Sequence, residues 1–312
     1  MSRVSPVGGL EQTAERAARW IREADRVVIG AGSGLSAAAG LDFGDEADFA
    51  ARFPALVRRG LTAAYQMIGY SELSEAAFWG FWSVHVMQTR FVDGRSPVYA
   101  SLLRLVREKD CFVLTSNVDA MFVRNGFEPE RVWSIQGDYA FLQCLRRCTT
   151  EVWPSAPPLQ RALAAIDPVT QEVADPACVP RCILCGGNVF MNVRGGDWFL
   201  EEPYRPQMER WRAWFGGIPP GERLLLLDVG SGFNTPSVVR WPMERIALRD
   251  PEARLVRINL HHAELPRELG GRSLSVAAGA REALAAIVEA ADDAARPDDA
   301  AGIHSLPPPI VE

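Results

Sequence analysis

The sequence predicts an α/β protein whose core is a Rossmann-like parallel sheet with helices on both faces. Short apolar runs, typical of strands buried in a parallel sheet, alternate with helical patterns along most of the chain. Two of these runs end in glycine-rich turns, as buried strands do before a helix. With 312 residues and 48% hydrophobic residues, the chain can bury one large core and a smaller insert.

Strands and helices alternate in both halves of the chain. Helices are expected at residues 11–23, 33–40, 98–107, 117–125, 202–215, 236–248 and 278–294. Apolar strands are expected at residues 26–30, 111–115, 132–135, 222–228 and 254–260. Gly126 is suited to end a helix, and Pro242 is expected to interrupt one.

Two segments depart from this alternation inside a main domain that spans about residues 10–295. The first is a helical insert at about residues 44–95. It carries four aromatic residues that form either a small core or an exposed ligand box: Phe78, Trp79, Phe81 and Trp82. The second, at about residues 139–194, is rich in cysteine and proline, which indicates a module held by metal more than by a core. A mobile tail is expected at residues 296–312.

Composition excludes some partners. The formal net charge is −6, so no overall basic character favours nucleic acid. No segment shows the charged-then-apolar pattern of a signal peptide, and none approaches the ~18 apolar residues of a membrane span. We therefore expect a cytoplasmic protein that binds neither nucleic acid nor a membrane.

Glycine turns follow two of the expected strands. Gly30-Ala31-Gly32 lies between a strand and a helix, where glycines let backbone N–H groups approach a pyrophosphate. A second turn begins at Gly230-Ser231-Gly232 and continues through Asn234 and Thr235. Two such turns on one sheet could hold the two halves of a dinucleotide, although a tight turn without a ligand is the alternative for the first.

Polar residues follow two other strands. Asn117 and Asp119 come directly after the strand that ends at Thr115, where they could also serve only as helix caps. Gln136-Gly137-Asp138 ends the third strand and could be an ordinary turn. Ligands of open α/β sheets gather outside the carboxyl ends of the strands, so both segments are candidate site residues.

Six cysteines are present, and five of them are clustered. Cys144 and Cys148 form one pair, and Cys182 and Cys185 form another, with spacings that fit a tetrahedral four-thiolate zinc site. Cys178 is a competing ligand, and free or buried thiols are the alternative. A four-thiolate site has no open position, so its role would be structural.

Together these segments resemble the sirtuin family. Gly30-Ala31-Gly32, with Ser36, Gly40, Asp42 and Phe43 after it, is similar to the family's Gly-Ala-Gly motif and the Asp-Phe that follows it. Thr-Ser-Asn-Val-Asp at 115–119 is similar to the family's Thr-Gln-Asn-Ile-Asp. Gln136-Gly137 stands where the family has its catalytic His-Gly, and paired cysteines follow. The resemblance covers about residues 20–290.

Departures from the family pattern narrow the resemblance to the macrodomain-linked class of sirtuins. Gln136 replaces the family's histidine base, and Gly44 stands where the family has Arg. Segments at 136–139, 191–194 and 232–236 support this class. What is known of the class implies ADP-ribosylation of a lipoylated carrier protein related to the glycine-cleavage carrier, with a macrodomain hydrolase as functional partner.

The resemblance also implies which residues form the site. Asn117, Asp119 and Gln136 would be catalytic, and zinc would be held by Cys144, Cys148, Cys182 and Cys185. NAD would be bound by Gly30, Ala31, Gly32, Ser36, Gly40, Asp42, Phe43, Ser116, Asn117, Asp119, Gln136, Gly230, Ser231, Gly232, Asn234, Thr235, Asn259 and Leu260. None of the four histidines lies in a motif, and we assign them no catalytic role.

Gln136 decides which reaction is expected. Deacylation by sirtuins needs a base that activates a ribose hydroxyl, and an amide cannot take up a proton at neutral pH. Loss of such a base typically costs about 10²–10⁴-fold in rate. Direct attack by an acceptor side chain on the sugar carbon remains open, because positioning supplies much of the catalysis. Asp138 is a candidate to activate that acceptor.

The leading hypothesis is therefore an NAD-dependent protein mono-ADP-ribosyltransferase. The alternatives are an NAD glycohydrolase, in which water is the acceptor, and a non-catalytic sensor of NAD or ADP-ribose. A deacylase ranks lower because of Gln136. A Rossmann dehydrogenase also ranks low, because Leu35 stands where the Gly-x-Gly-x-x-Gly fingerprint needs its third glycine.

Overall fold

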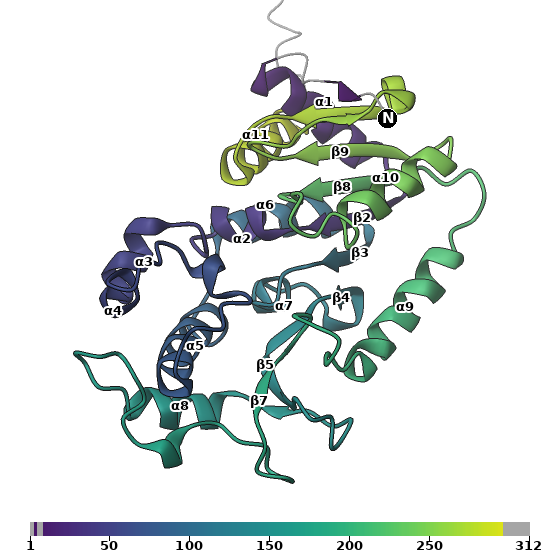
Figure 1. Ribbon diagram of the computed structural model, residues 1–312. Coiled ribbons are helices and arrows are strands. Elements are labelled where there is room, and N and C mark those ends of the chain that lie inside the picture. Colours follow the sequence, from purple (N-terminus) through teal and green to yellow (C-terminus); the bar gives the residue numbers. More distant parts are fainter. Residues whose placement is uncertain (1–2, 5–8, 296–312) are drawn as a thin grey trace, which may run out of the picture.

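A six-stranded parallel sheet forms the larger part of the computed structural model, which describes residues 3–4 and 9–295 (Figure 1). Its strands lie in the order β11-β9-β8-β2-β3-β4. They are β2 (Arg26–Ala31), β3 (Asp110–Thr115), β4 (Val132–Ser134), β8 (Leu224–Val229), β9 (Arg254–Ile258) and β11 (Ser273–Val276). Counted along the chain, this is the order 3-2-1-4-5-6 of a doubly wound fold, which reverses direction between β2 and β8.

Helices cover both faces of this sheet, which confirms the predicted fold class. One face is covered by α1 (Leu10–Glu23), α6 (Pro97–Val106) and α11 (Ala280–Asp293), and the other by α9 (Arg205–Gly216) and α10 (Arg240–Arg249). The strands carry apolar residues on both sides: Val27 and Ile29 face the first group of helices, and Val28 faces the second. This double burial explains the continuous apolar runs in the sequence.

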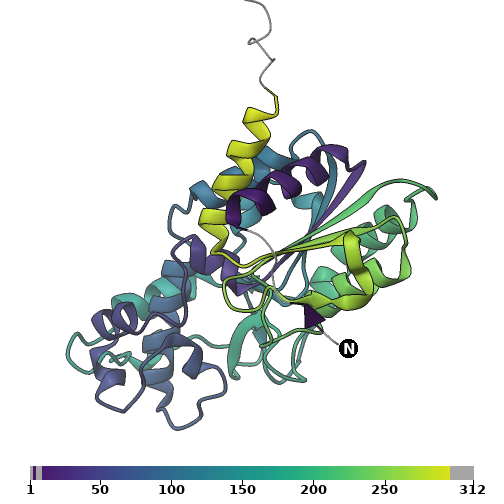
Figure 2. The same cartoon turned by 90° about the horizontal axis from the view of Figure 1, so that it is seen from above.

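The two inserted segments form a second lobe beside the sheet (Figure 2). The first contributes α3 (Glu46–Arg52), α4 (Pro54–Val57), η1 (Ala64–Met67) and α5 (Glu75–Arg90). The second contributes an antiparallel sheet of order β6-β5-β7, with α8 (Ala156–Ala164) and η3 (Pro176–Cys178). Its strands are β5 (Gly137–Cys144), β6 (Trp153–Pro154) and β7 (Val189–Val193).

One hydrophobic core joins the two halves of this second lobe. Trp79, Phe81 and Trp82 are buried in the same cluster as Leu142 and Leu159. The aromatic residues of α5 therefore form a core and not an exposed ligand box. The cysteine-rich module was expected to be held by metal more than by a core, but it also shares a core, because its strands and α8 pack directly on the helical insert.

Several expected boundaries also change. The helix expected at residues 117–125 is reduced to α7 (Met121–Arg124), because Ala120 has a left-handed backbone with φ of 55°. Pro242 does not interrupt α10, because it lies in the first turn, where its missing N–H costs nothing. The strand β11 was not expected, since its two serines hide the apolar pattern.

The remaining elements are short. The helix expected at 33–40 is observed as α2 (Ser33–Ala38). It ends before Gly40, whose backbone φ is 95°. The others are β1 (Arg3–Val4), β10 (Leu265–Pro266), η2 (Pro129–Arg131), η4 (Glu202–Tyr204) and η5 (Arg267–Arg272). The tail expected at residues 296–312 lies outside the described residues. Along the described chain, no helix combines the length and apolarity needed to cross a membrane.

Candidate active site

The predicted site residues gather at one edge of the large sheet. Five parallel strands end beside them, at Ala31, Thr115, Ser134, Val229 and Ile258. The segments that follow these ends hold the predicted NAD residues from Gly32 to Leu260. The two glycine turns follow β2 and β8, the neighbouring strands between which the sheet order reverses. Ligands of this fold class bind at that point.

The glycine turns pack directly on each other. The amide of Gly34 donates to the carbonyl of Gly230 at 3.1 Å. A Cβ atom on Gly32 would lie 2.6 Å from the Gly230 carbonyl oxygen, and Gly230 itself has φ of 72°. These glycines are thus required by contact between the turns, in addition to any approach to a phosphate. Gly232 differs, because a Cβ atom there would meet nothing within 4 Å.

A buried polar centre lies beside the first turn. Ser36, on α2, donates its hydroxyl to Asp119 Oδ2 at 2.5 Å, and the Met121 amide donates to Asp119 Oδ1 at 2.9 Å. Asn117 donates from Nδ2 to the Gly32 carbonyl at 3.0 Å. Burial raises the pKa of Asp119, and the hydrogen bond from Ser36 partly opposes this shift. The centre thus confines one carboxyl group, an amide and a hydroxyl in a water-poor space.

Only one of the two predicted residues bonds to the start of a helix. Asp119 accepts the amide of Met121, two residues further on, at the start of α7. Asn117 caps no helix, and its side chain instead crosses from the end of β3 to the first glycine turn. Ser116, directly before Asn117, donates its amide to the Ala31 carbonyl at 3.0 Å. The segment after β3 is therefore tied to the segment after β2.

Gln136 lies at the junction of the two lobes, just before β5. Its Oε1 atom is buried and accepts no hydrogen bond from any described residue. Its neighbour Asp138 is paired with Arg90, by Nε to Oδ1 at 2.7 Å and by Nη2 to Oδ2 at 3.3 Å. Both Asp138 oxygens are engaged, which disfavours the idea that Asp138 activates an acceptor.

Phe43 and Asp42 lie on the segment between α2 and α3. The ring of Phe43 contacts the edge of His85, with 4.6 Å between centroids, whereas Asp42 is exposed and caps the Gly44 amide at 2.8 Å. His85 is enclosed by the rings of Phe81, Trp82 and Tyr139. Burial lowers the pKa of His85 to about 3, so its imidazole is neutral. Phe43 is thereby attached to the second lobe.

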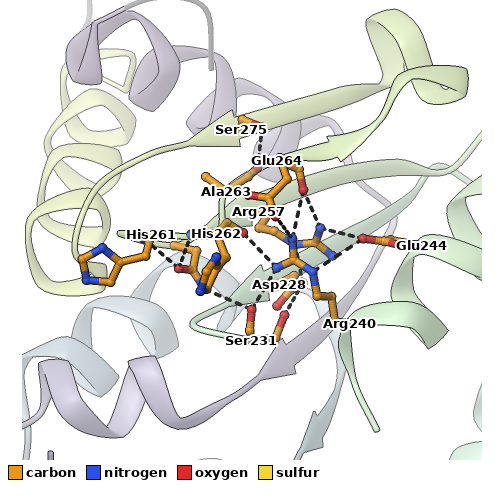
Figure 3. Close-up of polar contacts among 11 residues, drawn as sticks. Asp228, Ser231, Arg240, Glu244, Arg257, His261, His262, Ala263, Glu264 and Ser275 are labelled. Carbon is orange, nitrogen blue, oxygen red and sulfur yellow. Dashed lines mark hydrogen bonds and ion pairs between the residues drawn. The ribbon is translucent and has the colours of Figure 1, made fainter. Parts of the chain in front are cut away.

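The turns after β8 and β9 meet in a second cluster (Figure 3). Asn259 Nδ2 donates to the Ser231 carbonyl at 3.0 Å, and the Ser231 hydroxyl donates to Asp228 Oδ2 at 2.7 Å. The predicted residues Asn234, Thr235 and Leu260 are exposed on the same turns. The structure thus places the predicted residues in two groups, one around Asp119 and one around Ser231.

Several polar residues at this edge were not predicted from the sequence. Arg240 and Arg257 are fully buried, and Arg257 pairs with Asp228 at 2.8 Å. The position of Arg257 within the apolar strand β9 was the one signal in the sequence that could have indicated a buried ion pair. Tyr99 of α6 was also missed: its hydroxyl is buried beside Ser36 and Asn117, and burial together with the charge of Asp119 raises the pKa of Tyr99. Nothing in the helical pattern of α6 distinguishes it from a core residue.

The four cysteines predicted as ligands lie together in the second lobe. The Sγ atoms of Cys144, Cys148, Cys182 and Cys185 all lie within 4.8 Å of one another. The Cys144–Cys185 and Cys148–Cys182 sulfur distances are 3.7 and 3.5 Å. A tetrahedral zinc site with Zn–S bonds of about 2.3 Å requires sulfur atoms about 3.8 Å apart. The set could therefore hold zinc. Cys178 lies outside it, with its thiol on Asp175.

Two curated proteins are similar in sequence, whereas no protein-family model matches the chain. One, from Fusarium oxysporum f. sp. cubense, is named probable bifunctional ADP-ribose hydrolase/ADP-ribosyltransferase; it is 37% identical over 280 residues, which are 87% of this chain and 47% of that protein. The other, from Staphylococcus aureus, is named protein ADP-ribosyltransferase; it is 25% identical over 263 residues, 81% of this chain and 80% of that protein. This chain thus spans less than half of the fungal protein and four fifths of the bacterial one.

Solved sirtuin structures share the fold. A complex of a Sir2 homolog with NAD superposes with a TM-score of 0.58 at 14% identity and covers 94% of this chain and 98% of that one. Sir2Tm bound to a propionylated peptide superposes with a TM-score of 0.53 at 17% identity, over 88% of this chain and 97% of that one. Identities this low speak for the fold alone. The expected resemblance is confirmed at that level: this chain has the sirtuin fold and is similar in sequence to two proteins named for ADP-ribosyl transfer.

Proposed function

We propose that this protein is an NAD-dependent protein mono-ADP-ribosyltransferase that breaks the nicotinamide–ribose bond and transfers ADP-ribose to a protein acceptor. The observation that carries this proposal is the presence of a glutamine, Gln136, at the position of the family's catalytic histidine. Its buried, unpartnered Oε1 atom lies where the resemblance places the proton-accepting histidine of deacylases. The names of the two sequence relatives support the same reaction.

The two groups of site residues divide the dinucleotide between them. The group around Asp119 binds the nicotinamide and its ribose, with Asn117 and Ser36 as polar partners and Phe43 as a cover. The turns that begin at Gly30 and Gly230 bind the diphosphate and the adenosine half. Backbone N–H groups at such turns favour anions, and the point where the sheet order reverses brings the two turns together.

Gln136 directs the sugar toward transfer. Its amide oxygen accepts a hydrogen bond from a ribose hydroxyl or from the acceptor but takes no proton. The acceptor forms a bond to the sugar carbon as the bond to nicotinamide breaks, and the acceptor's proton passes to solvent. Nicotinamide leaves as a neutral molecule from a cationic ring, so the step needs no strong acid. Alignment of the reacting atoms supplies the rate enhancement.

The acceptor we propose is a lipoylated carrier protein related to the glycine-cleavage carrier, as the resemblance to macrodomain-linked sirtuins implies. We also propose an ADP-ribose hydrolase of the macrodomain type as functional partner; the name of the Fusarium relative, which joins both activities, supports this. The four-cysteine set would hold zinc in a structural role, because four thiolates leave no open position. Clustered cysteines that could hold a metal are typical of a reducing compartment, which supports a location in the cytoplasm.

Intact-mass analysis tests the proposal. The chain is incubated with NAD and a lipoylated carrier, with the unlipoylated carrier in parallel, and free nicotinamide is measured in the same samples. Transfer predicts a carrier heavier by one ADP-ribose and an equal amount of nicotinamide. Nicotinamide and free ADP-ribose without a labelled carrier would establish a glycohydrolase instead. NAD binding without nicotinamide release would establish a sensor. Turnover of an acyl-lysine peptide that falls in Gln136→Ala would establish a deacylase.

A further inference from the structure

Arg240 is a fully buried arginine beside the second glycine turn. It is the first residue of α10 and follows directly on the loop that begins at Gly230. Arginines are almost never fully buried unless they are paired, because removing a charge from water is costly. Burial lowers the pKa of Arg240 to about 10, so the side chain stays charged at neutral pH. Its partners must therefore account for its position.

Those partners come from two different turns (Figure 3). Nη1 donates to the carbonyl of Ser231 at 3.0 Å and to that of His262 at 2.8 Å. Nη2 donates to the carbonyl of Glu264 at 3.1 Å and pairs with its Oε1 atom at 3.1 Å. One side chain thus joins the turn after β8 to the turn after β9. These two turns carry all the predicted NAD residues from Gly230 to Leu260.

The Ser231 carbonyl is fixed from two directions. It accepts from Arg240 Nη1 and also from Asn259 Nδ2, both at 3.0 Å. The peptide bonds of the described chain are trans, so the Gly232 N–H points opposite to this carbonyl and away from Arg240. Within the described residues the Gly232 amide donates to no protein group, and a Cβ atom there would meet nothing within 4 Å. The turn therefore presents an unused donor next to open space.

A second buried arginine, Arg257, stabilises the same two turns. Arg257 pairs with Asp228 at 2.8 Å and with Glu244 at 2.8 Å, and donates to the Glu264 carbonyl at 2.8 Å. The ring of Phe233 lies 4.4 Å from the Arg240 guanidinium. Removing one member of a buried charge network leaves its partners uncompensated. The two turns are thus held in one arrangement before any ligand arrives.

We propose that Arg240 is a positioning residue for the nucleotide. It fixes the orientation of the Ser231–Gly232 peptide group and holds the turn after β8 against the turn after β9. As a result, the Gly232 N–H and the turn carrying Asn259 face the diphosphate and ribose oxygens of the adenosine half. This inference rests on the proposed function. Because Arg240 is attached to the adenosine group and not to the Asp119 group, it acts on nucleotide affinity and leaves the bond-breaking step unchanged.

Three variants separate this role from a merely structural one. Arg240→Met removes the hydrogen bonds, and Arg240→Lys keeps the charge but lacks the planar fork that reaches several acceptors. Arg272→Met is the control: Arg272 donates to the carbonyls of Ala247, Asp250 and Ala253 at 2.8–2.9 Å, away from both turns. The measurements are kcat and KM for nicotinamide release from NAD, the Kd for ADP-ribose, and amide hydrogen exchange of residues 230–235 and 259–264 without ligand.

The expected result is a split between affinity and turnover. Arg240→Met raises the KM for NAD and the Kd for ADP-ribose by about 10–100-fold, since hydrogen bonds to a charged group are typically worth about 1.5–3 kcal/mol. Its kcat stays within about threefold, and exchange in both turns accelerates; Arg240→Lys falls between this variant and the wild type. Arg272→Met lowers the melting temperature but leaves KM and Kd unchanged.

Two outcomes overturn the inference, and they differ from each other. If the wild-type chain binds ADP-ribose but Arg240→Met and Arg240→Lys bind it equally well, only the role of Arg240 is wrong. If the wild-type chain binds neither NAD nor ADP-ribose, the proposed function fails, and this inference fails with it. Should Arg240→Met not fold, Arg240→Lys still decides, because unchanged exchange and unchanged KM in that folded variant contradict the proposed positioning role.

Discussion

The two halves of the candidate site are built from different kinds of contact. Around Asp119, neutral groups meet a single buried carboxyl, and the Gln136 Oε1 atom has no partner among the described residues. Around Ser231, two arginines and three carboxylates interlock: Arg240, Arg257, Asp228, Glu244 and Glu264. In the first half the Gln136 Oε1 atom and the Tyr99 hydroxyl have no hydrogen-bond partner among the described residues, whereas in the second half every charged side chain is paired, although single atoms such as Asp228 Oδ1 stay unused.

This difference assigns different tasks to the two halves. A prearranged set of turns binds a constant part of a ligand without reorganising, which suits the adenosine half. Unused acceptors and a destabilised carboxyl suit the half where bonds change, because they gain partners only when substrate arrives. The second lobe supports the reaction half alone, since β5 begins at Gly137, next to Gln136, and Phe43 packs on His85.

The largest expected effect comes from breaking the four-cysteine set. The double substitution Cys182→Ser and Cys185→Ser should abolish nicotinamide release, because a zinc ion held by this set would stabilise the lobe that positions Gln136. Binding of ADP-ribose, measured by calorimetry, should persist, because the turns after β8 and β9 do not depend on that lobe. Cys178→Ser is the matched control and should leave both readouts unchanged. Equal loss of binding and turnover would show that the halves are not independent.

A smaller effect is expected from Asn117→Ala. Loss of the amide that crosses to the Gly32 carbonyl should lower kcat for nicotinamide release by about 100-fold, the typical cost of one preorganised polar group in an active site. The KM for NAD should change much less, in contrast to Arg240→Met. Single-turnover measurements of nicotinamide formation check this expectation. A purely structural role of Asn117 would instead lower the melting temperature and leave kcat per folded molecule intact.

Two glycines provide a matched pair. Gly32→Ala places a methyl group 2.6 Å from the Gly230 carbonyl oxygen and should destabilise the contact between the turns, with a lower melting temperature and weaker binding. Gly232→Ala meets no protein atom and should leave the melting temperature unchanged. If a ligand approaches Gly232 closely, this variant raises the KM for NAD about 3–10-fold, a cost of about 1 kcal/mol. Unchanged KM would place the ligand elsewhere.

The smallest expected effect is a gain in stability from Asp119→Asn. Burial raises the pKa of Asp119 above its unfolded value, so its ionised form opposes folding. This penalty is absent below the unfolded pKa, grows as the pH rises from the unfolded to the folded pKa, and stays constant above it. The substitution should raise the melting temperature at neutral pH, by roughly 2–4 °C for each kcal/mol relieved, and the gain should vanish in acid. Thermal unfolding across pH checks this, and a lower melting temperature at neutral pH would contradict it.

Much of the fold could be predicted because its strands are buried on both faces. The runs at β2, β3 and β8 are continuous and apolar, and each ends in the turn or polar segment that the site uses. The strand β11 was missed because Ser273 and Ser275 alternate with apolar residues, which hides a short parallel strand. The helix expected at 117–125 was too long because Asp119 turns its carboxyl back onto the Met121 amide.

The candidate site also contains residues that the sequence could predict and residues that it could not. The motifs predicted Asn117, Asp119, Gln136 and the four clustered cysteines, since each follows a strand or has a characteristic spacing. The motifs could not predict Arg240, because its partners at His262 and Glu264 lie more than 20 residues away and meet it only after folding. The predicted reason why position 32 needs a glycine was also incomplete. Only the folded chain shows that a second turn occupies the space next to Gly32.

The shared core of the second lobe limits how this protein can be recombined. Because the segments at 44–95 and 137–193 pack on each other through Trp82 and Leu142, neither has a complete interior without its counterpart. A chimera that takes the cysteine module from a distant relative should fold only if it takes the α5 segment as well. Variation in these two stretches is therefore expected to be correlated, although residues 96–136 separate them in the chain.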